Sequence, residues 1–141
     1  MSVGNPRIER WLVLGQALGA LALGIAWWRS ASTGWPDAGL ALSGLGVALA
    51  GAAYPSLRRA FRVGPIPQPG TVLVCTGIYR WVRHPMYVGA LLVFTAAVTS
   101  RPSIGVALAV AFNATWYLVK ASYEESLLLA HFPDYAAYRR R

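Results

Sequence analysis

Residues 11–28 read WLVLGQALGALALGIAWW, an 18-residue run without a charged side chain. As a helix, this run would rise about 27 Å, close to the roughly 30 Å hydrocarbon core of a bilayer. Tryptophans stand at both of its ends, as is typical of membrane–water interfaces. Three further uncharged runs follow at residues 38–54, 86–100 and 103–119. The sequence therefore predicts an all-α fold, an integral membrane helical bundle with four transmembrane helices.

The composition favours a membrane domain and excludes several other classes of protein. Of the 141 residues, 56% are hydrophobic and 13% are charged, whereas a soluble domain carries about 25% charged residues. The single cysteine, Cys75, cannot form an internal disulfide, and no cysteine–histidine cluster offers a metal site. We expect one membrane domain over residues 1–141. A signal peptide at the first run is the weaker alternative, because Trp27 and Trp28 lie where cleavage needs small residues.

Basic residues are distributed unequally between the two ends of the predicted helices. Of the 13 lysines and arginines, all except Arg29 and Arg101 lie before the first run, between the second and third, or after the fourth. Basic flanks stay in the cytoplasm, so we expect both termini and the central segment there, with the protein in the inner (cytoplasmic) membrane. Anionic headgroups attract such scattered charges. The net charge of +8 therefore does not indicate a nucleic-acid partner, since no recognition module accompanies it.

The first two runs carry small residues at helical spacing, including Gly15 and Gly19. Small residues allow helices to approach closely in lipid, so we predict packing roles for both runs. Gln16 is polar within the first run, and we expect it to form a helix–helix hydrogen bond rather than to bind a ligand. The small-residue stripes can pack within one chain or between two, which leaves the oligomeric state open.

A polar segment before the third run has the features of a binding loop. Residues 64–71 read GPIPQPGT, which excludes a regular helix, and we expect a cofactor loop over residues 64–85. Pro85 suits the first turn of a helix. The backbone N–H groups of residues 86–88 would then lack intrahelical partners and form a candidate anion site. A merely solvated helix start is the alternative.

The fourth run is predicted to continue as a helix, because no glycine or proline follows it before Pro133. Spacings of four, three and four place a polar stripe on one face of this helix: Asn113, Tyr117, Lys120 and Glu124. Polar groups in lipid should face protein or a cavity, so the residues of this stripe are candidates for contact with a substrate. A simple pair between Lys120 and Glu124 is the alternative. Residues 120–141 are predicted to form a cytoplasmic C-terminal extension whose aromatic residues lie on the bilayer surface.

Two motifs in the second half of the chain resemble a known family. They are Gly77-Ile78-Tyr79 with Arg83-His84-Pro85-Met86-Tyr87-Val88-Gly89, and Glu124-Glu125 with Leu128, Phe132, Tyr135 and Tyr138. Together they resemble the isoprenylcysteine carboxyl methyltransferases and the related phospholipid methyltransferases. The resemblance covers roughly residues 70–138. It implies S-adenosylmethionine as methyl donor, bound at the cytoplasmic end of the last two helices.

The resemblance also implies roles for individual positions. The implied cofactor residues are Leu73, Val74, Tyr79, His84, Pro85, Met86, Tyr87 and Glu124. Lys120 stands where the family has a substrate-side arginine, and Asn113 and Tyr117 extend the same stripe as candidate substrate residues. Arg83 is the candidate group for holding the donor carboxylate or orienting the acceptor. Glu125 is the candidate base, which only an amine acceptor requires.

Two other functions remain open from the sequence. A membrane sterol or steroid reductase would use NADPH, whose phosphates require more basic residues in the pocket. A non-catalytic subunit would use its basic faces to bind anionic lipid or a partner. For the methyltransferase, the acceptor is expected to be a membrane lipid or a lipophilic small molecule, and its methyl-accepting group can be a thiol, carboxylate, amine or phenol.

Overall fold

The computed structural model describes residues 4–34, 36–57 (side chains to residue 55) and 72–140, and these residues are helical wherever they have regular structure. The elements are α1 (Pro6–Arg29), α2 (Asp37–Leu57), the 3-10 turn η2 (Gly77–Arg80), α3 (Pro85–Ser100), α4 (Ile104–His131) and α5 (Tyr135–Arg139). The prediction of an all-α fold is therefore confirmed for the described chain. Residues 58–71 lie outside the described residues, and they include residues 64–71 of the predicted cofactor loop, which is the whole of its part before Val72.

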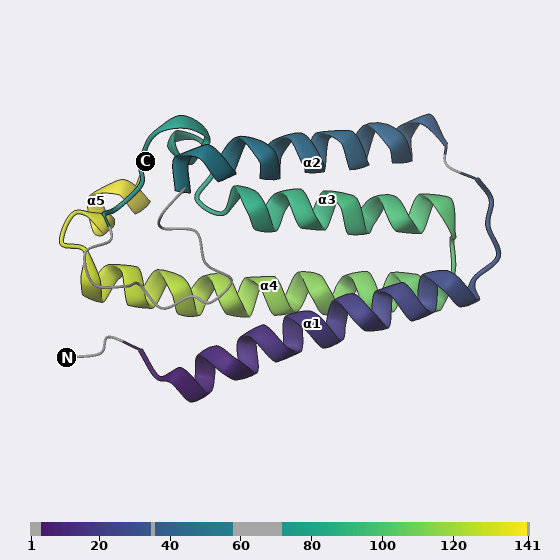
Figure 1. The fold of residues 1–141 in the computed structure, drawn as a ribbon, viewed down its shortest axis with the longest axis horizontal. Helices are drawn as coiled ribbons and strands as arrows, with labels where there is room; N and C mark the ends of the chain where they lie inside the picture. Colours follow the sequence, from purple (N-terminus) through teal and green to yellow (C-terminus); the bar gives the residue numbers. More distant parts are fainter. Residues whose placement is uncertain (1–3, 35, 58–71, 141) are drawn as a thin grey trace.

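The four long helices form two layers that run roughly along one axis (Figure 1). One layer pairs α2 with α3, which have the most extensive contact in the bundle, and the other pairs α1 with α4. The contact between α3 and α4 joins the layers. Because of this topology, the start of α3, the end of α4 and α5 lie at the same end of the bundle, which we call the site end (Figure 1).

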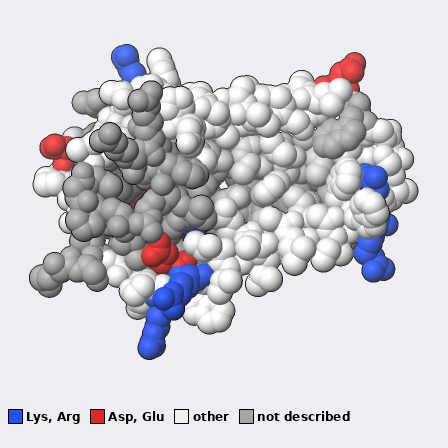
Figure 2. Space-filling model, viewed as in Figure 1, with Lys and Arg blue, Asp and Glu red and all other residues white. Residues whose placement is uncertain are grey.

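The lengths of the helices test the predicted membrane spans. Three helices, α1, α2 and α4, are long and apolar enough to cross a membrane. The fourth, α3, has 16 residues and would rise about 24 Å, which is less than a typical hydrocarbon core. The structure thus supports three spans by length, where the sequence predicted four. In the view of Figure 2, the charged side chains gather at the two ends and leave an uncharged belt between them.

Local sequence accounts for where the helices begin and end. The side chain of Asn5 accepts a hydrogen bond from the backbone N–H of Arg7 at 2.9 Å and caps α1. The side chain of Ser103 caps α4 in the same way, through the N–H of Val106 at 3.2 Å. As predicted, α4 continues well beyond residue 119 and ends at His131, two residues before Pro133.

Glycines allow the close contacts within each layer. A methyl group on Gly89 of α3 would lie 2.5 Å from the carbonyl oxygen of Gly46 on α2. A methyl group on Gly15 of α1 would overlap the ring of Trp116 on α4, and one on Gly19 would lie 2.7 Å from Asn113. The predicted packing role of Gly15 and Gly19 is confirmed, and these two contacts lie within one chain.

We expect Gly89→Ala to lower stability by about 1–3 kcal/mol, because the backbone of α2 cannot move away without separating the layer. The matched control is Gly44→Ala, since nothing lies within 4 Å of a methyl group built there. That change should be neutral or stabilising, because alanine favours a helix over glycine by about 1 kcal/mol. Thermal unfolding in detergent measures both variants. Equal effects would contradict a specific approach of α2 and α3.

Candidate functional site

The centre of the site is a hydrogen bond between α3 and α4 at the site end. The hydroxyl of Tyr87 donates to the Oε2 atom of Glu124 at 2.9 Å. Tyr87 lies in the first turn of α3 and Glu124 lies late in α4, so the antiparallel pairing of the two helices brings them together. Charge-assisted hydrogen bonds of this kind are stronger than neutral ones. The two motifs quoted from the sequence therefore meet at one place.

His84 connects both glutamates to the start of α3. Its Nδ1 atom lies 3.7 Å from Glu124 Oε2, and its Nε2 atom lies 3.3 Å from Glu125 Oε1. Its ring stacks on Tyr87, with ring centres 5.3 Å apart and planes 2° from parallel. Pro85 follows at the first helical position and is fully buried. Because proline disfavours helical geometry in the preceding residue, His84 is fixed outside the helix, beside both carboxylates.

Glu125 is held by several donors. Its Oε1 atom lies 3.2 Å from Arg83 Nη1 and its Oε2 atom lies 3.2 Å from Arg139 Nε, in addition to the contact with His84. Its side chain is 14% exposed, so these are partly buried pairs. The sequence offered Glu125 as a base, but both of its oxygens are occupied by cations. A carboxylate in this position organises the surrounding arginines, since accepting a proton would give up both ion pairs.

The start of α3 differs from the predicted anion site. The backbone N–H groups of Tyr87 and Val88 both donate to the carbonyl oxygen of His84, each at 3.1 Å. From the sequence, these amides were predicted to lack intrahelical partners. The capping carbonyl of His84 satisfies them instead, because residue 84 already accepts the first bonds of the helix. The amides of Tyr87 and Val88 are therefore engaged within the first turn of α3.

The C-terminal extension folds back onto the site. Tyr135 of α5 is 1% exposed, and the hydroxyl of Tyr138 donates to the backbone carbonyl of Tyr79 in η2. The prediction that aromatic residues of this tail lie on the bilayer surface is therefore wrong for Tyr135, which is buried in the protein. Burial and the nearby carboxylate of Glu124 raise the pKa of Tyr79 to about 12, so its hydroxyl stays protonated at neutral pH.

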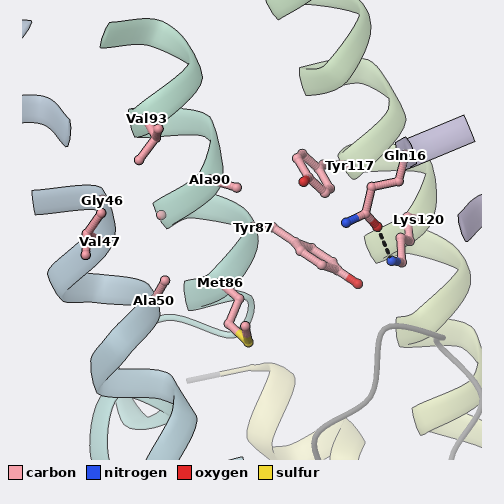
Figure 3. Close-up of a pocket in the computed structure, with 11 residues that line it drawn as sticks. Gln16, Gly46, Val47, Ala50, Met86, Tyr87, Ala90, Val93, Tyr117 and Lys120 are labelled. Atoms are coloured by element: carbon pink, nitrogen blue, oxygen red, sulfur yellow. Dashed lines mark hydrogen bonds between the residues drawn. The ribbon is translucent and has the colours of Figure 1, made fainter. Parts of the chain in front are cut away.

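A cavity of about 290 Å³ adjoins this polar cluster. The residues that line it come from all four long helices and are Gln16, Gly46, Val47, Ala50, Met86, Tyr87, Gly89, Ala90, Val93, Tyr117 and Lys120. Figure 3 shows the apolar members on α2 and α3, and the polar members grouped on the side of α4 and α1. Tyr87 belongs to both places, because its hydroxyl contacts Glu124 and its ring lines the cavity.

The polar end of the cavity is built from Lys120, Gln16 and two tyrosines. Lys120 is 1% exposed, and its ammonium donates to the amide oxygen of Gln16 (Figure 3). The same ammonium lies 5.4 Å from the ring centre of Tyr87, within cation–π range. Tyr117 stacks on Tyr87 with ring centres 5.1 Å apart. An apolar space thus ends at a buried lysine.

Comparison with known proteins was made against families, curated proteins and solved structures. The profile of the phospholipid methyltransferases matches residues 37–134, which is more than half of the chain. The chain belongs to this family. It is a family of integral membrane methyltransferases related to the isoprenylcysteine carboxyl methyltransferases. The search of curated proteins and the search of solved structures found no match.

Membership in the phospholipid methyltransferase family identifies the general class of this chain, which is that of the integral membrane methyltransferases. The matched region contains α2, η2, α3 and α4, and therefore both glutamates and the whole of the cavity wall except Gln16. Helix α1 and the residues of α5 lie outside it. Both of these outlying elements nevertheless contact the site, through Gln16 and Arg139.

The structure brings most of the predicted site residues together. Arg83, His84, Tyr87, Glu124 and Glu125 form one connected network. Three more lie beside it or line the cavity: Met86, Tyr117 and Lys120. Leu73 and Val74 are half-buried in the segment that leads to η2.

Asn113 is the predicted substrate residue that the structure does not bring to the cavity. It is buried as the stripe predicts, but its amide donates to the backbone carbonyls of Gly19 at 2.9 Å and Ala109 at 2.8 Å. It therefore joins α4 to α1. A polar side chain in an apolar helix needs a hydrogen-bond partner, and a neighbouring helix can supply that partner as readily as a substrate can.

Sequence reasoning missed two groups that complete the site. Gln16 was predicted to form a helix–helix hydrogen bond, which is confirmed, but its partner Lys120 makes it part of the cavity. Its position as a polar residue in an apolar run was the available signal. Arg139 gave no such signal, because it lies among three consecutive arginines at the end of the chain.

Proposed function

We propose that this protein transfers a methyl group from S-adenosylmethionine to a lipophilic acceptor at the cytoplasmic face of the inner membrane. The observation that carries the proposal is the position of Tyr87, which joins a polar cluster with both glutamates to an apolar cavity. A charged, water-soluble donor reaches the site from the aqueous phase, whereas a lipophilic acceptor reaches it from the bilayer. A site that serves both therefore needs a polar part and an apolar part in contact. Placing the two groups in contact is the larger part of catalysis for a transfer of this kind.

The residues of the polar cluster fit the donor. Glu124, whose side chain is 27% exposed, supplies a carboxylate for an ammonium group. Arg83, whose side chain is 43% exposed, supplies a guanidinium for a carboxylate. The stacked rings of His84 and Tyr87 offer aromatic faces for a cation or an adenine. S-adenosylmethionine would supply an electrophilic methyl group on a sulfonium.

Residues of this chain would position the donor and exclude water from the site. Pro85 and the pair between His84 and Glu125 keep the start of α3 in place. Glu125 keeps Arg83 and Arg139 on the same side of the cluster. The apolar walls of the cavity exclude water, which favours a transfer that neutralises charge. The distribution of basic residues supports the cytoplasmic orientation, since all lysines and arginines except Arg29 and Arg101 lie before the first uncharged run, between the second and third, or after the fourth.

Titrating the purified protein with S-adenosylmethionine and with NADPH, by calorimetry in lipid nanodiscs, tests the proposal. We expect saturable binding of S-adenosylmethionine in the micromolar to millimolar range typical of enzyme substrates, and no binding of NADPH. Incubation with methyl-labelled donor and a lipid extract should then yield a labelled lipophilic product. Failure of a folded sample to bind the donor would refute the proposed function.

A further inference from the structure

The short segment before α3 has one side inside the protein and one side outside. In its 3-10 turn η2, Tyr79 is buried and its backbone carbonyl accepts from Tyr138. The next two residues, Arg80 and Trp81, are exposed, and Trp81 has 79% of its surface accessible. The guanidinium of Arg80 lies over the indole of Trp81, 5.6 Å from its ring centre, within cation–π range. We call this pair the outer edge of η2.

The position of Trp81 favours one environment. Residues 81–84 have no regular helix, and irregular backbone that faces lipid does not occur within the hydrocarbon core. In water, the indole would forgo the free energy of burying a large apolar ring. The headgroup region suits both parts, because it hydrates the backbone and covers the ring, and tryptophan is enriched there. The exposure of Trp81 therefore favours the membrane–water interface.

Two long helices also present aromatic side chains at the site end. Trp11 near the start of α1 is 70% exposed, and Tyr54 near the end of α2 is 58% exposed. Both helices are long and apolar enough to cross a membrane. Figure 1 shows the start of α1 and the end of α2 at the site end, and η2 contacts α2. Exposed aromatic residues on several segments at one end of a bundle are typical of an interfacial belt, which Trp81 extends to η2.

The charge of the outer edge indicates which lipid it meets. Arg80 has no ion pair with another described residue, whereas Arg83 and Arg139 are both paired with Glu125. A guanidinium presents N–H donors in a fork that suits phosphate oxygens, and an anionic leaflet attracts basic residues that lie close to it. A protein partner would need a much larger surface than one indole and one guanidinium. The complementary occupant is therefore an anionic phospholipid headgroup.

The outer edge is joined directly to the candidate donor site. Tyr79 and Arg80 are consecutive residues of η2, and the backbone N–H of Trp81 donates to the carbonyl of Ile78 at 3.0 Å. A 3-10 turn of four residues depends on its contacts for order. We propose that Arg80 and Trp81 bind anionic phospholipid headgroups of the leaflet at the site end, and thereby hold η2 in the conformation that binds the donor. The second half rests on the proposed methyl transfer.

The first test locates Trp81 without any donor. The full chain is placed in nanodiscs whose lipids carry bromine, which quenches indole fluorescence, near either the headgroup or the end of the acyl chain. The chain has six tryptophans, so Trp81→Phe is measured beside the wild type and the difference gives the contribution of Trp81. We expect bromine near the headgroup to quench this contribution more strongly than bromine at the chain end. Quenching by iodide in water and by neither lipid would overturn the proposal.

The second test measures how donor affinity depends on the lipid. Calorimetry with S-adenosylmethionine is run in nanodiscs of phosphatidylcholine and in nanodiscs with added phosphatidylglycerol. The donor is a net cation that any anionic surface concentrates, so Arg80→Ala in the same discs corrects for this effect. In the anionic discs, we expect the wild type to bind the donor about 3- to 10-fold more tightly than Arg80→Ala, as one basic residue at the surface allows. In phosphatidylcholine the two should be equal.

Variants at the two ends of the bundle separate a local effect from a general one. Trp81→Ala should weaken donor binding about 3- to 10-fold in both kinds of disc, and Trp81→Tyr should restore it, because tyrosine also favours the interface. The matched controls are Trp28→Ala and Arg29→Ala. Trp28 is likewise 79% exposed and Arg29 is exposed, but both lie at the opposite end of α1. These two variants should bind the donor as the wild type does.

The outcomes distinguish this inference from the proposed function. Equal donor affinities of the wild type and Arg80→Ala in anionic discs, or an equal loss in Arg29→Ala, would overturn the inference and leave the methyltransferase standing. Free glycerol phosphate that reproduced the lipid effect in phosphatidylcholine would also overturn it, because the edge would then bind a soluble anion. A wild-type protein that binds no donor would remove the proposed function, whereas the quenching test would still decide whether Trp81 meets lipid.

Discussion

Glu124→Gln should weaken binding of S-adenosylmethionine about 30- to 150-fold, because a hydrogen bond to a charged group contributes about 2–3 kcal/mol. The glutamine keeps the size of the side chain and a carbonyl that can accept from Tyr87. It removes the negative charge that we assign to the donor ammonium. Helix packing should therefore be retained while the donor affinity falls. Calorimetry in nanodiscs and methyl transfer into a lipid extract measure the two effects.

The adjacent residue provides the matched control. Glu125→Gln is the same change one position along α4, but it acts on the pairs with Arg83 and Arg139. Its effect on the donor should be smaller and indirect, about 3- to 10-fold, since the two arginines are about half exposed and ion pairs with such partners contribute little individually. Methyl transfer at saturating donor should survive in this variant. Complete loss of transfer at saturating donor would instead support Glu125 as a base.

The fold was largely predictable because the membrane imposes strong rules on sequence. Long uncharged runs become helices in which every backbone group is paired, and Pro85 and Pro133 mark two helix boundaries through simple backbone chemistry. The meeting of Tyr87 and Glu124 followed from two helices joined by a short turn. Whether α3 spans the membrane could not be predicted in the same way. Its 16 residues are bounded by Pro85 and Pro102, and this length alone does not determine how deeply the helix lies in lipid.

The parts of the site that were not predictable depend on pairings between distant segments. Nothing in residues 11–28 states that α1 lies along α4, so the contact of Gln16 with Lys120, 104 positions away, has no local signature. The amides at the start of α3 were predicted to be free because the carbonyl of His84 was overlooked as their acceptor. The tail was interpreted from its amphipathic pattern, which cannot distinguish a bilayer surface from the surface of the protein itself.

These two kinds of residue also differ in how they relate to the family. The residues found from motifs lie in the region that matches the phospholipid methyltransferases. The residues that only the structure brought to the site, Gln16 and Arg139, lie outside it. Gln16 contacts Lys120 at the cavity, whereas Arg139 contacts Glu125 in the polar cluster.

Tyr135→Ala should detach the C-terminal segment from the site. Tyr135 is the largest of the fully buried side chains and is 1% exposed, and truncating a large buried aromatic residue costs about 3–5 kcal/mol. Helix α5 has five residues, too few to be stable without packing. We therefore expect loss of the Tyr138 bond to Tyr79 and of the pair between Arg139 and Glu125, with faster hydrogen exchange across residues 135–139.

The effect on function follows from what the detached segment no longer holds. Without α5, η2 loses its contact with Tyr138 and Glu125 loses one of its two arginines, so donor affinity should fall about 10- to 100-fold through the lost order. The long helices should melt almost as in the wild type, because their contacts are unchanged. Arg140→Ala, at the exposed end of α5, is the control and should behave as wild type in exchange and calorimetry. Unchanged donor affinity in a variant whose tail exchanges freely would show that the tail covers the site without shaping it.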